Sequence, residues 1–322
     1  MSVRTVELIE LHCVDHCNNN CRWCNSHSPF APDRTYDAEE YYPWLDALVR
    51  NRIGFSMLSI SGGEPFLHPR IFEFCQKLRQ RYAKRLMLST NLFWLSEFDI
   101  EFHRPLFGLL HTLRVTVFPN MVRGLGGLER VQKLLERLKA TSPHVYVDVR
   151  LAEEHFCRLE FTAEPLDVNQ HCPCAESVNL LVDGRLARCA PGAYAHFSPH
   201  AIQEFRDSTD MFYDLRQPDA DFWHWKYKWP MDACSHCTHF RQERSQWKVE
   251  SGTRRRRELE ARYNLNLGAQ LEQDEPTPGI LRRQNEALIV ATPPEVRAKL
   301  PAACLHGNVY YMPRRQGLHA RE

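Results

Sequence analysis

Short apolar runs alternate with amphipathic stretches through the first half of the chain. Five runs have the length and composition of buried strands, at 6–11, 57–61, 85–91, 112–118 and 145–150. Between them, apolar residues recur at helical spacing in 37–52, 70–81, 100–110 and 125–140. This alternation is typical of βα units, so the sequence predicts a parallel sheet with helices outside it. Functional groups are then expected at the C-terminal ends of the strands.

The pattern changes from about residue 153, where apolar runs shorten and most of the remaining cysteines occur. Residues 178–182 and 185–188, joined by Asp183-Gly184, predict a β-hairpin with both turn residues at positive φ. This hairpin would bring Cys174 close to Cys189. We therefore predict three parts: an α/β core in 1–155, a small cysteine-rich domain in 156–245, and a C-terminal tail with short helices in 246–322.

Composition narrows the possible classes of protein. With 43% hydrophobic residues, 25% charged residues and a formal net charge of +1, the chain is typical of soluble proteins and not of nucleic-acid binders. No segment approaches the ~18 apolar residues of a membrane span, and no secretory signal is present, so we expect a cytoplasmic protein without membrane association. In that reducing compartment, twelve cysteines indicate metal ligands, catalytic thiols or buried side chains more often than disulfides.

Three cysteines after the first predicted strand have the spacing of a metal site. Cys17, Cys21 and Cys24 form C-x3-C-x2-C, and three protein thiolates leave one coordination position open for chemistry. Cys13 precedes them within the strand and is expected to be a buried neighbour, as is Cys75 on the apolar face of its helix. A zinc site that uses all four N-terminal cysteines is the alternative.

This triplet, followed by Gly62-Gly63-Glu64-Pro65 after the second strand, resembles the radical S-adenosylmethionine (radical SAM) superfamily. The resemblance implies a partial (β/α)6 barrel in which Cys17, Cys21 and Cys24 hold a [4Fe–4S] cluster whose open iron binds SAM. It implies that the Glu64 carboxylate balances the positive charge of the methionine ammonium of SAM. It also implies that Gly62 and Gly63 let the backbone of this turn approach SAM closely. The implied cofactor-binding residues are Trp23, Gly62, Gly63, Glu64, Pro65, Ser89, Thr90 and Asn91. Packing is the alternative role for Trp23, and strand capping for the three residues after the third strand.

A second cysteine set, Cys174, Cys189, Cys234 and Cys237, resembles the twitch extension, the half-length form of the SPASM domain. The resemblance implies one auxiliary [4Fe–4S] cluster at these four residues. Cys172 competes with Cys174 for one position, and a structural zinc is the alternative metal. Histidines near the cysteines, including His16, His27, His171, His236 and His239, are expected to be peripheral groups and not ligands.

The resemblance implies an enzyme that cleaves SAM with an electron from a reductant such as flavodoxin or ferredoxin. The 5′-deoxyadenosyl radical would then take a hydrogen atom from a small-molecule substrate, such as a sugar, aminocyclitol or nucleoside intermediate, leading to dehydrogenation, decarboxylation or epimerisation. A sequence that enters the first strand directly favours a small molecule over a ribosomal peptide, which is the alternative substrate. A non-catalytic iron–sulfur or zinc protein is the alternative of another class. Neither catalytic residues nor the oligomeric state can be assigned from the sequence.

Overall fold

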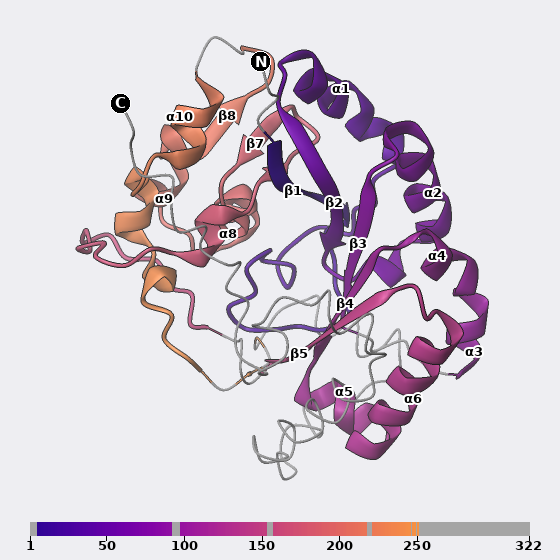
Figure 1. Ribbon diagram of the computed structural model, residues 1–322. Coiled ribbons are helices and arrows are strands. Elements are labelled where there is room, and N and C mark those ends of the chain that lie inside the picture. The colour runs from indigo at the N-terminus through magenta and orange to yellow at the C-terminus, as the bar shows by residue number, and fades with distance from the viewer. Residues whose placement is uncertain are drawn as a thin grey trace, which may run out of the picture.

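Eight strands form one open sheet in the part of the chain that the computed structural model describes, which is residues 5–91, 97–152, 157–217, 221–245, 247, 248 and 250 (Figure 1). The strand order is β5-β4-β3-β2-β1-β6-β7-β8. The first five strands run parallel and are β1 (Thr5–Val14), β2 (Gly54–Gly62), β3 (Arg85–Thr90), β4 (Thr112–Val117) and β5 (Tyr146–Leu151). The mixed α/β fold predicted from the apolar pattern is therefore confirmed.

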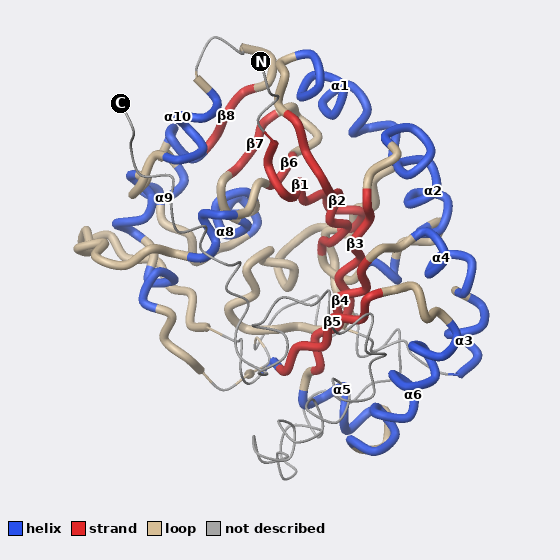
Figure 2. Tube along the Cα trace, viewed as in Figure 1, coloured by secondary structure: helices blue, strands red, loops and turns tan. Residues whose placement is uncertain are grey.

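The helices that connect these strands lie together along one face of the sheet (Figures 1 and 2). They are α1 (Tyr42–Arg50), α2 (Ile71–Tyr82), α3 (Glu97–Phe102), α4 (Arg104–Leu109), α5 (Pro119–Gly124) and α6 (Leu128–Thr141). The loop after β1, which carries Cys17, Cys21 and Cys24, lies on the opposite side of the sheet (Figure 1). Since helices cover one face of the sheet, the other face is the one that can hold a cofactor.

Two local predictions differ from the structure. The single helix expected over 100–110 is two short helices, α3 and α4, because Pro105 belongs in a first helical turn and starts α4 after the cap residue His103. The hairpin at 178–188 forms, but of its two turn residues only Gly184 has a positive φ, at 85°. The Gly184 N–H donates to the Leu181 carbonyl at 3.1 Å, so this loop is the three-residue kind that ends in a left-handed glycine.

The cysteine-rich segment continues the same sheet. β6 (Asn179–Leu180) runs parallel to β1, with Glu10 opposite Asn179, and then pairs antiparallel with β7 (Arg185–Ala187), which pairs with β8 (Phe212–Asp214). Three short helices follow or flank these strands: α8 (Ala190–Ala193), α9 (Gln203–Arg206) and α10 (Phe222–Tyr227). One sheet thus contains strands from both sides of the predicted domain boundary at residue 155. The division into domains stays a prediction.

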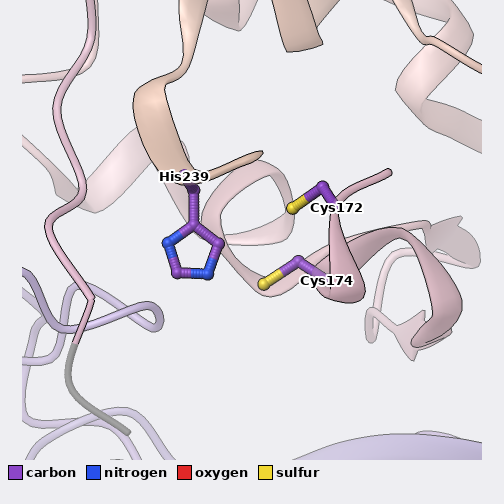
Figure 3. Close-up of side chains that lie close together, drawn as sticks. All are labelled: Cys172, Cys174 and His239. Carbon is purple, nitrogen blue, oxygen red and sulfur yellow. The ribbon is translucent and has the colours of Figure 1, made fainter. Parts of the chain in front are cut away.

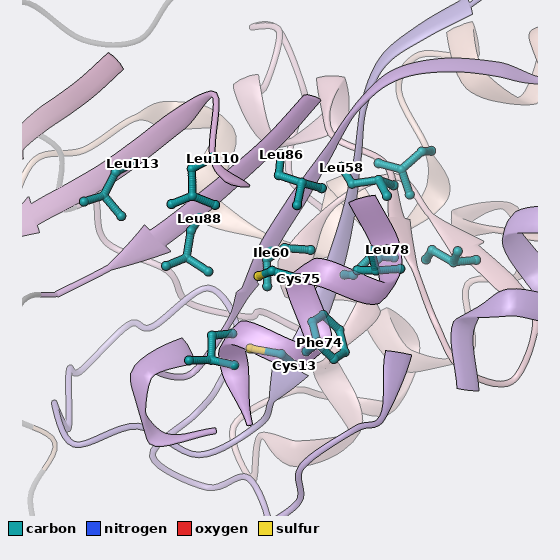
Figure 4. Close-up of a cluster of buried hydrophobic side chains, with 14 of the residues drawn as sticks. Cys13, Leu58, Ile60, Phe74, Cys75, Leu78, Leu86, Leu88, Leu110 and Leu113 are labelled. Atoms are coloured by element: carbon teal, nitrogen blue, oxygen red, sulfur yellow. The ribbon is translucent and has the colours of Figure 1, made fainter. Parts of the chain in front are cut away.

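A single large core joins the sheet to its outer helices. Figure 4 shows Cys13 of β1 and Cys75 of α2 among leucine, isoleucine and phenylalanine side chains, and both cysteines are 0% exposed. Both were predicted to be buried, and this prediction is confirmed. No helix in the described part of the chain combines the length and apolarity needed to cross a membrane. The predicted tail helices, the arginine run at 254–257 and Cys304 lie outside the described residues.

Candidate functional site

The loop that leaves β1 brings Cys17, Cys21 and Cys24 together. Burial raises the pKa values of the Cys17 and Cys21 thiols, and the nearby Cys24 raises both further. Close thiols whose ionisation is this costly become thiolates only where a metal cation compensates their charge. Cys13 does not join them, because it is buried in the core and its Sγ lies 3.4 Å from the Ser61 carbonyl oxygen. The structure therefore groups three thiols, and not four, in this loop.

N–H groups already point at two of these sulfurs. Cys17 Sγ accepts from the Asn19 backbone N–H at 3.2 Å and from Asn91 Nδ2 at 3.5 Å. Cys21 Sγ accepts from Trp247 Nε1 at 3.1 Å. Such donors stabilise negative charge on sulfur and raise the reduction potential of a cluster that the sulfurs hold.

Trp247 was missed in the sequence, where it follows the predicted cysteine-rich domain and belongs to no motif. Its side chain is 2% exposed. Its neighbours also close over the loop, because the Arg22 N–H donates to the Lys248 carbonyl at 2.9 Å and the Glu250 N–H to the Asn20 carbonyl at 2.7 Å. No local signal could have revealed this contact, since it joins residues more than 220 positions apart.

Replacing Trp247 by phenylalanine is expected to make the cluster at Cys21 harder to reduce. The ring still fills its buried site, but the N–H donor to sulfur is lost, so the reduced cluster with its extra negative charge is less stable. A reductive titration followed by EPR measures the change, and we expect a more negative midpoint potential at unchanged iron content. A Trp44→Phe variant, which removes an indole N–H that donates to the Val182 carbonyl and not to a sulfur, is the control. An unchanged potential in Trp247→Phe would contradict this assignment.

Gly62 and Gly63 allow the end of β2 to press against the cysteine loop. A Cβ atom on Gly62 would lie 1.9 Å from the Val14 carbonyl oxygen, and one on Gly63 would lie 1.8 Å from the His16 carbonyl oxygen. The Gly63 N–H donates to Val14 and the Glu64 N–H to His16, at 2.9 and 3.0 Å. The sequence suggested that the pair gives backbone access to a ligand. The structure shows a second need for glycine, which is the close approach of two segments of this chain.

Glu64 is a buried carboxylate between the cysteine loop and the end of β3. It is 0% exposed and accepts hydrogen bonds from Thr90 Oγ1 at 2.7 Å, the Asn91 N–H at 2.7 Å and the Phe66 N–H at 3.2 Å. Burial raises its pKa to about 7 despite these bonds. In the described part of the chain no ion pair joins it to a basic side chain, so a cationic ligand would find a charge partner here.

The other predicted cofactor contacts are placed as follows. Thr90 and Asn91 are buried, and both hold Glu64, whereas Ser89 is half-buried within β3. Pro65 starts a 3-10 turn, Pro65–Leu67, that the Glu64 side chain caps. Trp23 is half-buried, with a left-handed φ of 59° and the Arg22 guanidinium 4.9 Å from its ring centre.

The second cysteine set also converges, on a cavity with mostly apolar walls. Its lining includes the four predicted residues and two more possible ligands: Cys172, Cys174, Cys189, Cys234, Cys237 and His239. Burial raises the pKa of Cys189 to about 12 and that of Cys234 to about 11, so these thiols too need a cation to ionise. Figure 3 shows Cys172 and Cys174 side by side, and the choice between them stays open.

Two buried basic side chains lie near this cavity, and no pattern in the sequence predicted them. Arg188 is 2% exposed, and its Nη1 donates to the Trp225 carbonyl at 3.1 Å. Its guanidinium is close enough to Cys234 and Cys189 to interact electrostatically with their thiolates. Lys226 Nζ donates to the Ala175 carbonyl at 3.2 Å. Of the aromatic stretch 222–229, Phe222 and Trp225 of α10 pack in the main core, while Trp229 lines the cysteine cavity.

The two cysteine sets are neighbours. Asn25 Nδ2, from the first loop, lies 4.0 Å from Cys174 Sγ, and His27 Nε2 lies 3.3 Å from the Pro191 carbonyl oxygen at the start of α8. A cavity of about 360 Å³ borders the first loop. Its lining is Cys21, Arg22, Trp23, Cys24, His27, Pro29, Phe30, Leu159, Glu160, Phe161, Ser198, His200 and Glu250.

Comparison with known proteins agrees with this geometry. Residues 12–149 match the Radical SAM superfamily model. The chain contains a radical SAM domain. This domain spans β1 to β5, so it includes the three-thiol loop, the Gly-Gly-Glu-Pro turn and the buried Glu64. Radical SAM domains imply a [4Fe–4S] cluster and SAM. Three thiols, and a buried carboxylate with no ion pair to a described basic side chain, are a donor set that fits both.

Curated relatives share part of the radical SAM domain. The chain is 34% identical over 100 residues to a GTP 3′,8-cyclase of Helicobacter pylori and 30% identical over 90 residues to a probable GTP 3′,8-cyclase of Pyrococcus abyssi. These matches cover 29% and 27% of this chain, and only 30% and 28% of the relatives. Among solved structures, BtrN in complex with AdoMet and 2-DOIA matches 77% of this chain and 100% of its own, at 14% identity and a TM-score of 0.46.

Proposed function

We propose that this protein is a radical SAM enzyme that abstracts a hydrogen atom from a small, polar molecule. The observation that carries the proposal is the three-thiol loop with Glu64 buried behind it. Cys17, Cys21 and Cys24 would hold the [4Fe–4S] cluster, and the burial of the Cys13 thiol in the core supports three ligands over four. The vacant coordination position is where the amino and carboxylate groups of SAM would bind.

When bound and reduced, the cluster and SAM supply the chemistry, which is reductive cleavage of SAM to methionine and a 5′-deoxyadenosyl radical. The residues of this chain bind and orient. Glu64, fixed by Thr90 and Asn91, would pair with the methionine ammonium. Trp23 would lie beside the adenine, and Ser89 would contact the ribose or carboxylate. Trp247 and Asn91 donate to the Sγ atoms of Cys21 and Cys17, which would hold the cluster.

We propose in addition that Cys174, Cys189, Cys234 and Cys237 hold an auxiliary [4Fe–4S] cluster, as in a twitch domain. Their convergence on one cavity supports this, and the buried Arg188 guanidinium beside them offsets the negative charge of a thiolate-ligated cluster. Because the two cysteine sets are neighbours, an auxiliary cluster would lie near the substrate and would be suited to accept an electron from it.

The substrate class follows from the cavity beside the first loop. Its volume of about 360 Å³ is typical of small-molecule sites, and Glu160, Ser198 and His200 give it hydrogen-bonding groups. The relatives named GTP 3′,8-cyclase make nucleosides and nucleotides the first candidates within this class. A ribosomal peptide is the competing substrate.

Product analysis after anaerobic reconstitution tests the proposed function. With dithionite and SAM, we expect 5′-deoxyadenosine, and the amount should rise when the true substrate is added. Candidate nucleosides, sugars and aminocyclitols are compared with peptides encoded near the gene. If no 5′-deoxyadenosine formed although EPR showed a reduced cluster, the protein would be a non-catalytic iron–sulfur protein.

SAM affinity is expected to depend on pH through Glu64. Since burial raises the pKa of this carboxyl to about 7, lowering the pH from 8 to 6 protonates it and removes the charge that would hold the methionine ammonium. Below pH 7 the affinity should fall by up to about tenfold per pH unit. Glu64→Gln should bind SAM about 10- to 100-fold more weakly at pH 8, because a hydrogen bond to a charged group is lost, and its affinity should be flat with pH.

Equilibrium dialysis of the reconstituted protein at pH 6, 7 and 8 measures this dependence. Glu73→Gln, which changes a glutamate on the solvent side of α2, serves as the matched control and should behave like the wild type. A Glu64→Gln variant with the affinity and pH profile of the wild type would show that Glu64 does not contact SAM.

A further inference from the structure

His239 lies inside the second cysteine cavity and faces two of its thiols. A ring nitrogen of His239 and the Sγ atoms of Cys172 and Cys174 all lie within 4.8 Å of one another, and Figure 3 shows the three side chains converging from two segments of chain. His239 is 7% exposed, and a hydrogen bond with the Arg158 backbone helps to hold its ring in place. The ring is thus fixed beside two thiols in the wall of this cavity.

The position of His239 suits a metal ligand. Its ring is buried in the wall of the cavity that the five cysteines line, and a ring nitrogen is within ligand distance of two of the sulfurs. By contrast, the nearby His236 uses Nδ1 for a contact of 2.9 Å with the Thr162 carbonyl oxygen. His236 therefore contacts a backbone carbonyl, whereas His239, three residues later, faces the thiols of the cavity.

The spacing of these three donors indicates one shared coordination position. Ligands about 2.3 Å from one tetrahedral metal ion lie about 3.8 Å apart, so donors within 4.8 Å of one another can reach the same metal. An iron of a cubane cluster takes a single protein ligand. Cys189, Cys234 and Cys237 supply three ligands, so Cys172, Cys174 and His239 are three candidates for the fourth.

We propose that His239 is a metal ligand of this second centre and shares its fourth coordination position with Cys172 and Cys174. The inference rests on the auxiliary cluster of the proposed function and adds a nitrogen donor to it. Imidazole in place of thiolate removes a negative charge from the cluster and raises its reduction potential. Which of the three donors is bound would thus set how readily this centre accepts an electron.

Pulsed EPR on a chain with only the second centre tests this. The parent carries Cys17→Ala, Cys21→Ala and Cys24→Ala, so it has no SAM cluster and the test does not depend on SAM cleavage. Adding Cys172→Ala and Cys174→Ala leaves His239 as the remaining candidate. We expect this variant to keep about four irons per chain and, once reduced, to show nitrogen coupling to the cluster.

Two further changes give the matched comparison. Adding His239→Ala to that variant should abolish the nitrogen coupling and lower the iron content, whereas adding His236→Ala should change neither. The proposal is overturned if the variant without Cys172 and Cys174 shows no nitrogen coupling, or if His239→Ala leaves the coupling intact. Zinc instead of iron in the parent would refute the auxiliary cluster. The same comparison of zinc content across the variants would then decide whether His239 is a ligand.

Discussion

Replacing Cys21 by alanine is expected to abolish SAM cleavage, with 5′-deoxyadenosine falling to background in the presence of dithionite. Two thiols cannot hold a cluster that needs three protein ligands, so the vacant position for SAM is lost with the cluster. Cys21 is the most informative of the three cysteines to replace, because its sulfur also accepts the hydrogen bond from Trp247 Nε1. Iron analysis and product analysis together measure the effect.

Cys13→Ala is the matched control for this prediction. Cys13 lies four residues before Cys17 but is buried in the core, and its removal is expected to cost about 1 kcal/mol of folding free energy without affecting SAM cleavage. Zinc in the wild type that is lost in Cys13→Ala, with the fold retained, would support the four-cysteine zinc alternative. Product formation by Cys21→Ala would remove the three-thiol site from the mechanism.

Gly63→Ala is expected to have the second large effect, on folding and cluster assembly together. The added Cβ would lie 1.8 Å from the His16 carbonyl oxygen and 2.7 Å from the Cys17 backbone nitrogen. Neither atom belongs to a side chain that can turn away, so either β2 separates from the loop or Cys17 moves. We expect a loss of about 3–5 kcal/mol in the free energy of unfolding and a protein that retains little iron.

Gly108→Ala provides the control, because a Cβ there meets nothing within 4 Å and the residue belongs to the exposed side of α4. Alanine in a helix should stabilise this protein by about 0.5–1 kcal/mol relative to glycine. Chemical denaturation of the metal-free proteins and iron analysis after reconstitution compare the two variants. A Gly63→Ala protein with normal stability and iron content would contradict the packing argument.

Much of the fold could be predicted from the sequence, because local pattern dictated it. The five parallel strands and the helices between them carry enough apolar periodicity to be found without tertiary information. The predictions of local structure were wrong at two places, where the conformation of a single residue mattered more than the periodic pattern. Pro105 divided the helix expected over 100–110 into α3 and α4, and only Gly184 of the hairpin turn adopts a positive φ.

The sequence by itself determined the radical SAM domain and the two groups of cysteines, because thiol spacing and the Gly-Gly-Glu-Pro turn are local features of the chain. Only the tertiary structure decided that Thr90 and Asn91 fix Glu64, that Trp247 donates to Cys21, and that His239 faces Cys172 and Cys174. These contacts join residues 26 to more than 200 positions apart, or depend on how a buried ring is turned. Pairings of that kind arise from packing, which no spacing along the chain encodes.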